Sequence, residues 1–224
     1  VADLKKFAMI IKKHTGITVK MNLEENANAA AELPRLDANH PLLKGYFDGM
    51  YMQDEGEKLL AKKDIIKGAV DSSKGIVSGD FADLVLNVYI GRPFFTDSEL
   101  TAEMGAAILL HEIGHIFTYF ELLYRTATGN LIVNNITERL FGTNDKKIKY
   151  EILEDAKAKG YAIDQMDELV QANSKALIST IVLQDHLHET RNELGYNLYD
   201  ARTAESLADD YAIRMGYGKG LAKG

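Results

Sequence analysis

The chain has 224 residues, 46% of them hydrophobic, and carries 26 Lys and Arg against 33 Asp and Glu, a formal net charge of −7. This length suits one domain or two small lobes that share a core. The negative charge argues against nucleic acid or an anionic membrane as a partner. The absence of cysteine excludes disulfides, zinc ribbons and thiol nucleophiles, so a transition metal would have to use histidines and carboxylates.

No segment reaches the roughly 18 uncharged apolar residues that predict a membrane span. No signal-peptide pattern is visible either, which favours a soluble, cytoplasmic protein. The chain begins with Val1 rather than Met. A signal or pro-segment upstream of Val1 therefore stays open as an expectation.

Helix and strand patterns follow one another in the first 95 residues. The predicted elements, in chain order, are a helix from about Asp3 to Gly16, a strand at 17–23, an irregular stretch at 24–45, a helix at about 56–70, a strand at 84–90 and a short return strand at Phe94–Phe95. His40 precedes a proline in the irregular stretch, and we interpret it as a surface histidine.

The rest of the chain is predicted to be helical. Thr96 and Glu99 have the spacing of a capping box, which predicts the start of a long helix at about 97–126. Four further helices are expected at about 131–141, 146–159, 164–193 and 201–215, with Gly160 and Gly216 placed to end two of them.

The long helix carries the pattern H-E-x-x-H at His111, Glu112 and His115. On a helix, the two histidines lie about 40° apart, with Glu112 beside them. Both rings can then reach one metal ion, with a carboxylate next to the metal-bound water, as a zinc hydrolase requires. The alternative is that the histidines, which continue an apolar stripe, are hydrogen-bonded core residues.

A catalytic zinc needs a third protein ligand. The metzincin arrangement is excluded because it needs Gly at 118 and His at 121, where this chain has Thr118 and Glu121. The better candidate is Glu205, which shares a helix face with Asp209 among small residues. Glu205 can bind the metal, and Asp209 can accept the second ring N–H of His111 or His115. An acidic, solvated helix face is the plain alternative.

The competing ligand set is His186, His188 and Glu189. The two histidines are two residues apart, so they lie about 200° apart on a helix and cannot both face one metal there. We therefore prefer Glu205 as the third ligand and expect His186 and His188 on the surface or at the cleft.

Two segments, at about 87–117 and 202–216, carry motifs of a known family. The matching residues are Asn87-Val88-Tyr89, Phe94-Phe95-Thr96, Glu103, Ile108 to His115, Arg202, Glu205, Ala208, Asp209, Tyr211, Ala212 and Gly216. This pair of motifs resembles the gluzincin metallopeptidases of the HtpX and CAAX prenyl protease type. The resemblance implies zinc bound by His111, His115 and Glu205, with Glu112 as general base. Residues 1–80 have no counterpart in that family.

The expected fold is a helix-dominated, zincin-like α/β fold, with a small mixed sheet packed beside the helix that carries His111. We expect a single peptidase domain over 1–224, made of a sheet-containing lobe at 1–95 and a helical lobe at 96–224. The expected function is zinc-dependent hydrolysis of peptide bonds, in the manner of an endopeptidase, with one Zn²⁺ per chain. The alternative is a catalytically inactive structural or binding protein with a zincin fold, against which intact Glu112 argues.

In the expected mechanism, Glu112 takes a proton from the attacking water and passes it to the leaving amine. The oxyanion donor is left open among His186, His188, Arg191 and Tyr217. A peptide or protein substrate is expected to add to the strand 84–90 at the cleft edge, where Asn87 is a candidate contact.

Overall fold

The computed structural model describes residues 2–25, 29–35, 40–42, 66–197, 200 and 203–221. These fall into two compact units, each described by itself below. The first holds the described residues up to Tyr124 together with those from 200 onward, and the second holds 125–197. The sequence predicted a division of the chain between residues 95 and 96. The observed division differs, because half of the long helix and the C-terminal segment belong to the unit that contains the sheet.

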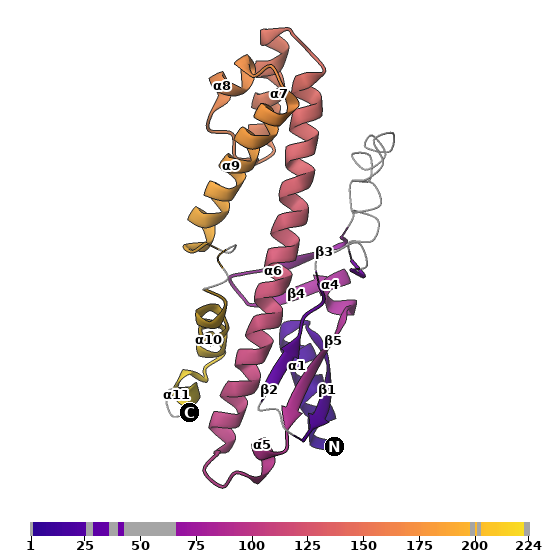
Figure 1. The fold of residues 1–224 in the computed structure, drawn as a ribbon, viewed down its shortest axis with the longest axis vertical. Coiled ribbons are helices and arrows are strands. Elements are labelled where there is room, and N and C mark those ends of the chain that lie inside the picture. The colour runs from indigo at the N-terminus through magenta and orange to yellow at the C-terminus, as the bar shows by residue number, and fades with distance from the viewer. Residues whose placement is uncertain are drawn as a thin grey trace. The chain divides into compact units, whose positions relative to one another are not determined.

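The chain has a helix-dominated α/β fold with a small mixed sheet, as predicted. The main sheet of the first unit has the order β1-β5-β2 (Figure 1). β1 (Thr18–Glu24) runs parallel to β5 (Val85–Gly91), and β2 (Ala29–Glu32) runs antiparallel to it. β1 and β5 confirm the two predicted strands. β2 lies in the stretch 24–45 that was predicted to be irregular, and the prediction is wrong at 29–32.

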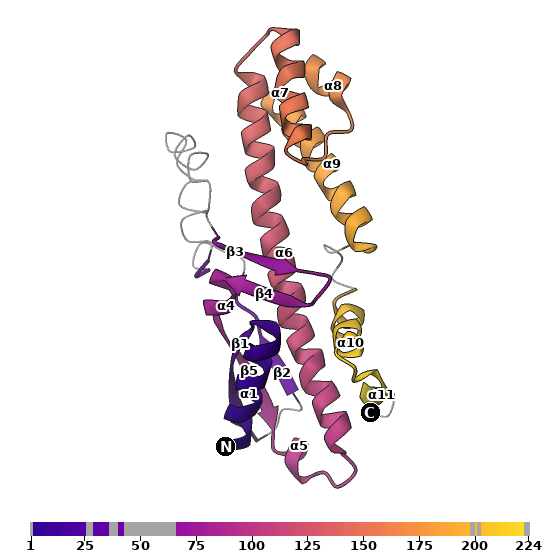
Figure 2. The ribbon, with the colours of Figure 1, turned by 180° about the vertical axis from the view of Figure 1, so that it is seen from behind.

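One face of this sheet forms the core of the first unit. Leu86, Val88 and Ile90 alternate along β5 and are buried. They pack with α1 (Ala2–Thr15) and with the first half of α6 (Ala102–Phe141). Figure 2 shows the sheet and these two helices from behind. Gly16, with a φ of 77°, ends α1 in the left-handed conformation that glycine adopts without steric cost, as predicted.

A second, two-stranded sheet crosses this unit. β3 (Gly68–Asp71) and β4 (Ile76–Gly79) form an antiparallel hairpin, followed by the short helix α4 (Asp80–Asp83). The helix predicted at 56–70 is therefore wrong at its C-terminal end, where β3 begins. Its residues before 66 lie outside the described part of the chain.

The helix with the H-E-x-x-H pattern is longer than predicted and starts later. α6 has 40 residues and takes in the segment 131–141, because no proline interrupts it. Its first turn is capped by Thr101, whose Oγ1 accepts a hydrogen bond from the Met104 N–H at 3.2 Å. The expected capping box is wrong, since Thr96 ends the short helix α5 (Pro93–Thr96), which replaces the predicted return strand.

The second unit is helical and has its own core. α7 (Lys146–Ala158) confirms the helix predicted at 146–159. The helix predicted at 164–193 is divided into α8 (Met166–Gln171) and α9 (Lys175–Leu194). The break has a local cause, because the Ser174 Oγ accepts a hydrogen bond from the Leu177 N–H at 3.2 Å and so caps a new helix.

α10 (Ala204–Arg214) confirms the predicted acidic helix and returns to the first unit, followed by α11 (Gly218–Leu221). Among the described helices, only α6 is long and apolar enough to cross a membrane. Buried residues make up 56% of its most apolar window, as in the core helix of a soluble protein, so this is a weak indication of a span.

Candidate metal centre

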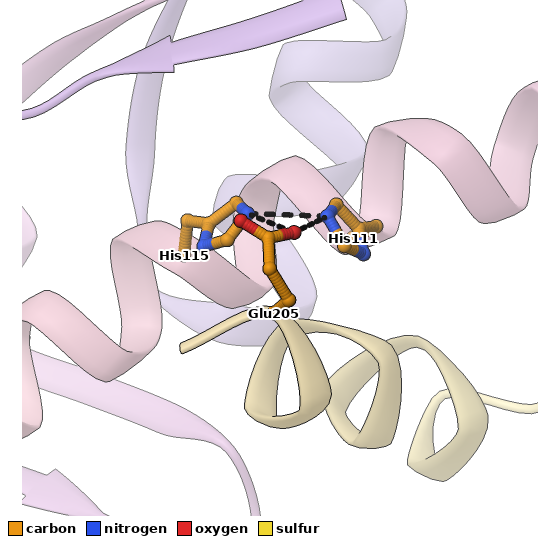
Figure 3. A group of neighbouring side chains, drawn as sticks. All are labelled: His111, His115 and Glu205. Carbon is orange, nitrogen blue, oxygen red and sulfur yellow. Dashed lines mark hydrogen bonds and ion pairs between the residues drawn. The ribbon is translucent and has the colours of Figure 1, made fainter. Parts of the chain in front are cut away.

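Three side chains from two helices of the first unit converge on one point. His111 and His115 extend from α6 and Glu205 extends from α10, and their ligand atoms all lie within 4.8 Å of one another. Figure 3 shows the two imidazoles and the carboxylate directed toward each other. This is the grouping expected from the sequence, and it could hold a metal ion. Among the residues that the structure describes, no other group of this kind is found.

The spacing of these donor atoms suits a small tetrahedral cation. Nε2 of His111 lies 3.1 Å from Nε2 of His115. Oε2 of Glu205 lies 3.3 Å from the first of these nitrogens and 3.5 Å from the second. Donors about 2.0–2.1 Å from a tetrahedral zinc ion are separated by about 3.3 Å, so the observed triangle has the right size. The set of two imidazoles and one carboxylate also matches zinc chemistry.

Asp209 lies one helical turn after Glu205 and contacts the back of the first histidine. Its Oδ1 lies 2.7 Å from Nδ1 of His111, which confirms the predicted contact with one of the two histidines. A carboxylate in this position accepts the Nδ1–H hydrogen bond and leaves the lone pair of Nε2 free for a metal. Asp209 therefore favours the His111 tautomer that a metal ligand needs.

The two helices can bring their side chains together because their backbones approach closely at Gly114. A Cβ atom built on Gly114 would lie 2.7 Å from Cα of Ala208 and 2.8 Å from its carbonyl oxygen. Both residues thus need to be small, and Ala208 is fully buried. The small face predicted for α10 is confirmed at Ala208. Gly216, with a φ of 91°, lies just beyond the end of the helix, as predicted.

The β3–β4 turn and an aromatic contact hold α10 in place within this unit. The Tyr211 hydroxyl donates to the Gly75 carbonyl at 3.0 Å, and the Arg214 guanidinium donates to the Ser72 carbonyl at 2.7 Å. The Tyr211 ring stacks on Phe117 of α6, with 5.2 Å between centroids. These contacts position the face of α10 that carries Glu205.

Glu112 lies beside the metal group and contacts the sheet. Its Oε2 accepts a hydrogen bond from the backbone N–H of Ala31 at 2.8 Å. Burial raises the pKa of the Glu112 carboxyl above its ordinary value, against smaller opposing effects of the Ala31 N–H and the two histidines. A carboxyl group with a raised pKa binds a proton more readily near neutral pH, as a general base must. Sequence reasoning missed the Ala31 contact because a backbone donor has no side-chain signature.

The prediction that strand 84–90 borders the cleft is wrong. β5 is the central strand and pairs on both sides, with β1 and with β2. Asn87 is not at a free edge: its amide donates to Glu32 Oε2 at 2.8 Å, and its Oδ1 accepts from the Asn22 amide at 3.1 Å. The edge strand beside Glu112 is β2, at the end of the sheet order in the described part of the chain.

The competing ligand set does not form a metal group. His186, His188 and Glu189 lie on α9 in the second unit, and the one group found among the described residues excludes them. His186 is directed at α6 of its own unit, where a Cβ atom on Gly129 would lie 2.5 Å from its Nε2. Its Nε2 is buried and has no hydrogen-bond partner among the described residues, and burial lowers the pKa of the ring below its ordinary value.

The oxyanion donor stays a prediction. His186, His188 and Arg191 belong to the second unit, whereas the metal group belongs to the first. Tyr217 is the one candidate in the first unit, between α10 and α11, with a side chain that is 39% exposed.

His40 is not the surface histidine that we expected. It is 1% exposed, and its Nε2 is hydrogen-bonded to the hydroxyl of Tyr119, which lies one turn of α6 after His115. Its Nδ1 accepts a hydrogen bond from the Leu42 N–H at 3.1 Å. The ring therefore attaches this short stretch of chain to α6.

Comparison with protein-family models, with curated proteins and with solved structures finds no match for this chain. The gluzincin resemblance therefore rests on the quoted motifs. The match at Arg202 lies outside the described residues.

Proposed function

We propose that this protein is a zinc-dependent endopeptidase. The observation that carries the proposal is the convergence of His111, His115 and Glu205 within 4.8 Å, with Glu112 next in sequence to one of the ligands. Two imidazoles and one carboxylate leave the fourth position of a tetrahedral zinc open, which distinguishes a catalytic zinc site from a closed structural one. The side chain of Glu205 is 76% exposed, so the open position can be reached from solvent.

Zinc, when bound, acts as a Lewis acid that polarises the scissile carbonyl and activates a water molecule for attack. The proposal assigns the proton transfers to this chain's own side chains. Glu112 accepts the proton of the water on its carboxylate and delivers it to the nitrogen of the departing amine. Asp209 keeps the Nδ1 proton on His111 throughout, so Nε2 stays available as a ligand.

The substrate is proposed to lie along β2 rather than β5. The Ala31 N–H points away from β5 to Glu112, so in this antiparallel pair the backbone groups of Ala31 face the edge of the sheet. An extended peptide can pair with such an edge by backbone hydrogen bonds. An edge that runs past the general base accommodates chain on both sides of the cleaved bond, which favours an endopeptidase.

The proposal is tested by loading the purified full chain with zinc and incubating it with unfolded casein. We expect one zinc per chain and internal cleavage of casein that stops when a chelator removes the metal and returns when zinc is added. A chain that binds one zinc and leaves casein and other unfolded proteins intact would instead support a zincin fold without turnover.

A further inference from the structure

The side chains of β2 that face the core do not fix its register against β5. Ala29 and Ala31 lie on that face, opposite Ile90 and Val88, with Ala30 between them on the other face. A slip of two residues would place Ala29 opposite Val88 and bring Ala27 of the sequence to the place of Ala29. Such a slip buries the same methyl groups, so hydrophobic patterning leaves this register weakly specified.

The next residue, Glu32, makes contacts that depend on the register. Its Oε2 accepts hydrogen bonds from the Asn87 amide at 2.8 Å and from the Tyr89 hydroxyl at 2.9 Å, both on β5. Both bonds lower the pKa of the Glu32 carboxyl, and the bond from Asn87 has the larger effect. A slip of two residues would bring Ala30 or Pro34 opposite Asn87, and neither side chain can accept these bonds.

The register matters because one particular backbone group of β2 contacts the candidate base. In the observed register, the Ala31 N–H donates to Glu112. A slip by one residue turns the backbone groups of position 31 toward β5 and would put the Glu32 side chain on the core face. A slip by two puts Ala29 or Leu33 in the place of Ala31, opposite Val88.

We propose that Glu32 is a positioning residue which, through Asn87 and Tyr89, pins the register of β2 and so holds the Ala31 N–H on the carboxylate of Glu112. The catalytic consequence of this contact rests on the proposed function, in which Glu112 is the general base. Asn87, expected to contact substrate, instead acts on the site through Glu32. The three strands β1, β5 and β2 are linked by this chain of contacts from Asn22 to Glu32.

The first test measures the backbone and needs no substrate. Hydrogen exchange of the Ala31 amide is followed by NMR in the full chain carrying Glu32→Ala, Glu32→Gln or Glu24→Ala. Glu24 is an exposed glutamate on β1, at the opposite edge of the same sheet, and serves as the matched control. We expect at least about tenfold faster exchange in Glu32→Ala, near wild-type exchange in Glu24→Ala, and rescue in Glu32→Gln, whose amide oxygen can still accept from Asn87 and Tyr89.

The second test measures catalysis in the same variants. A misplacement of about 1 Å at a site can cost 10²-fold in rate. We therefore expect kcat on a peptide substrate to fall about 10- to 100-fold in Glu32→Ala, with one zinc still bound, and to recover toward the wild-type value in Glu32→Gln. Tyr89→Phe removes one of the two donors and should give a smaller loss of the same kind, even if Glu32→Ala proves poorly folded.

The outcomes separate this inference from the proposed function. Unchanged Ala31 exchange in Glu32→Ala overturns the inference, whether or not the protein is a peptidase. Faster exchange in Glu32→Ala but not in Glu24→Ala supports the positioning role even if the wild type cleaves nothing, and then the peptidase proposal alone fails. An equal fall of kcat in Glu24→Ala and Glu32→Ala would also contradict it.

Discussion

The Nδ1 atom of His111 lies 2.7 Å from Oδ1 of Asp209, although the two residues are 98 positions apart in the sequence. The contact joins α6 to α10 directly behind the candidate metal ligands. In the proposed function, the two carboxylates of α10 have different roles: Glu205 binds the metal, and Asp209 orients a ligand.

Asp209→Asn is expected to weaken zinc binding without abolishing it. The amide oxygen of asparagine can still accept the Nδ1–H bond, but it lacks the negative charge that raises the basicity of the ring. Loss of such an orienting partner typically costs about 10- to 100-fold in metal affinity or activity. Zinc titration of Asp209→Asn beside Asp210→Asn, a change at the exposed neighbouring aspartate, checks this. Equal affinities in the two variants would show that Asp209 does not orient His111.

Glu205→Gln is expected to lower the zinc affinity by more than about 100-fold relative to wild type, a larger loss than in Asp209→Asn. The reason is that it removes a charged ligand rather than the hydrogen-bond partner of a ligand. The matched control is Glu189→Gln, which alters the competing cluster on α9. The zinc content of both variants is measured after dialysis. Retention of zinc by Glu205→Gln would show that Glu205 is not the third ligand.

Gly114→Ala should push α6 and α10 apart, and so move the two histidines away from Glu205. The added methyl group would lie 2.7 Å from Cα of Ala208, and neither backbone can yield without moving its helix. Overpacking of this kind costs about 1–3 kcal/mol of unfolding free energy. We expect that loss by denaturant unfolding, together with weaker zinc binding. Gly142→Ala, whose methyl group would lie 3.2 Å from the Glu138 carbonyl oxygen, should lose less stability and leave zinc binding unchanged. Normal zinc affinity in Gly114→Ala would mean that the close approach of α6 and α10 is not needed.

The buried His186 predicts a pH dependence of stability. Its pKa in the folded protein is lowered, mainly by burial, from the ordinary value of 6.5. The unfolded chain therefore binds this proton more readily, so stability is complete above about pH 6.5 and falls as the pH drops below it. Denaturant midpoints at pH 7.5 and 5.5 should differ less in His186→Leu than in the wild type or in His188→Leu. An unchanged pH dependence in His186→Leu would remove His186 as the cause.

The candidate metal site could be predicted from the sequence because the spacing of its residues is local. His111 and His115 share a face of one helix, and Glu205 and Asp209 share a face of another, among residues small enough for close approach. Each pattern is complete within one or two helical turns. The meeting of the two helices was inferred from the demand of a catalytic zinc for a third ligand.

The elements that the sequence did not predict depend on distant partners. β2 contains Ala29, Ala30 and Ala31, which show no alternation, and its extended conformation comes from pairing with β5 more than fifty residues away. The central place of β5 is likewise invisible in its own residues, which is why Asn87 was assigned to an edge. His40 is buried by Tyr119, and nothing adjacent to it in sequence indicates this contact.

The central claim is that Glu112 acts as the base of a zinc peptidase, and Glu112→Gln tests it most directly. The amide keeps the shape of the side chain but cannot take a proton, and general-base catalysis contributes about 10² to 10⁴ in rate. Bound zinc and casein cleavage are measured on the same preparations of wild type and variant. The account predicts one zinc per chain in both proteins and a loss of cleavage by at least about 100-fold in Glu112→Gln. Cleavage by Glu112→Gln at the wild-type rate, with zinc retained, would contradict it.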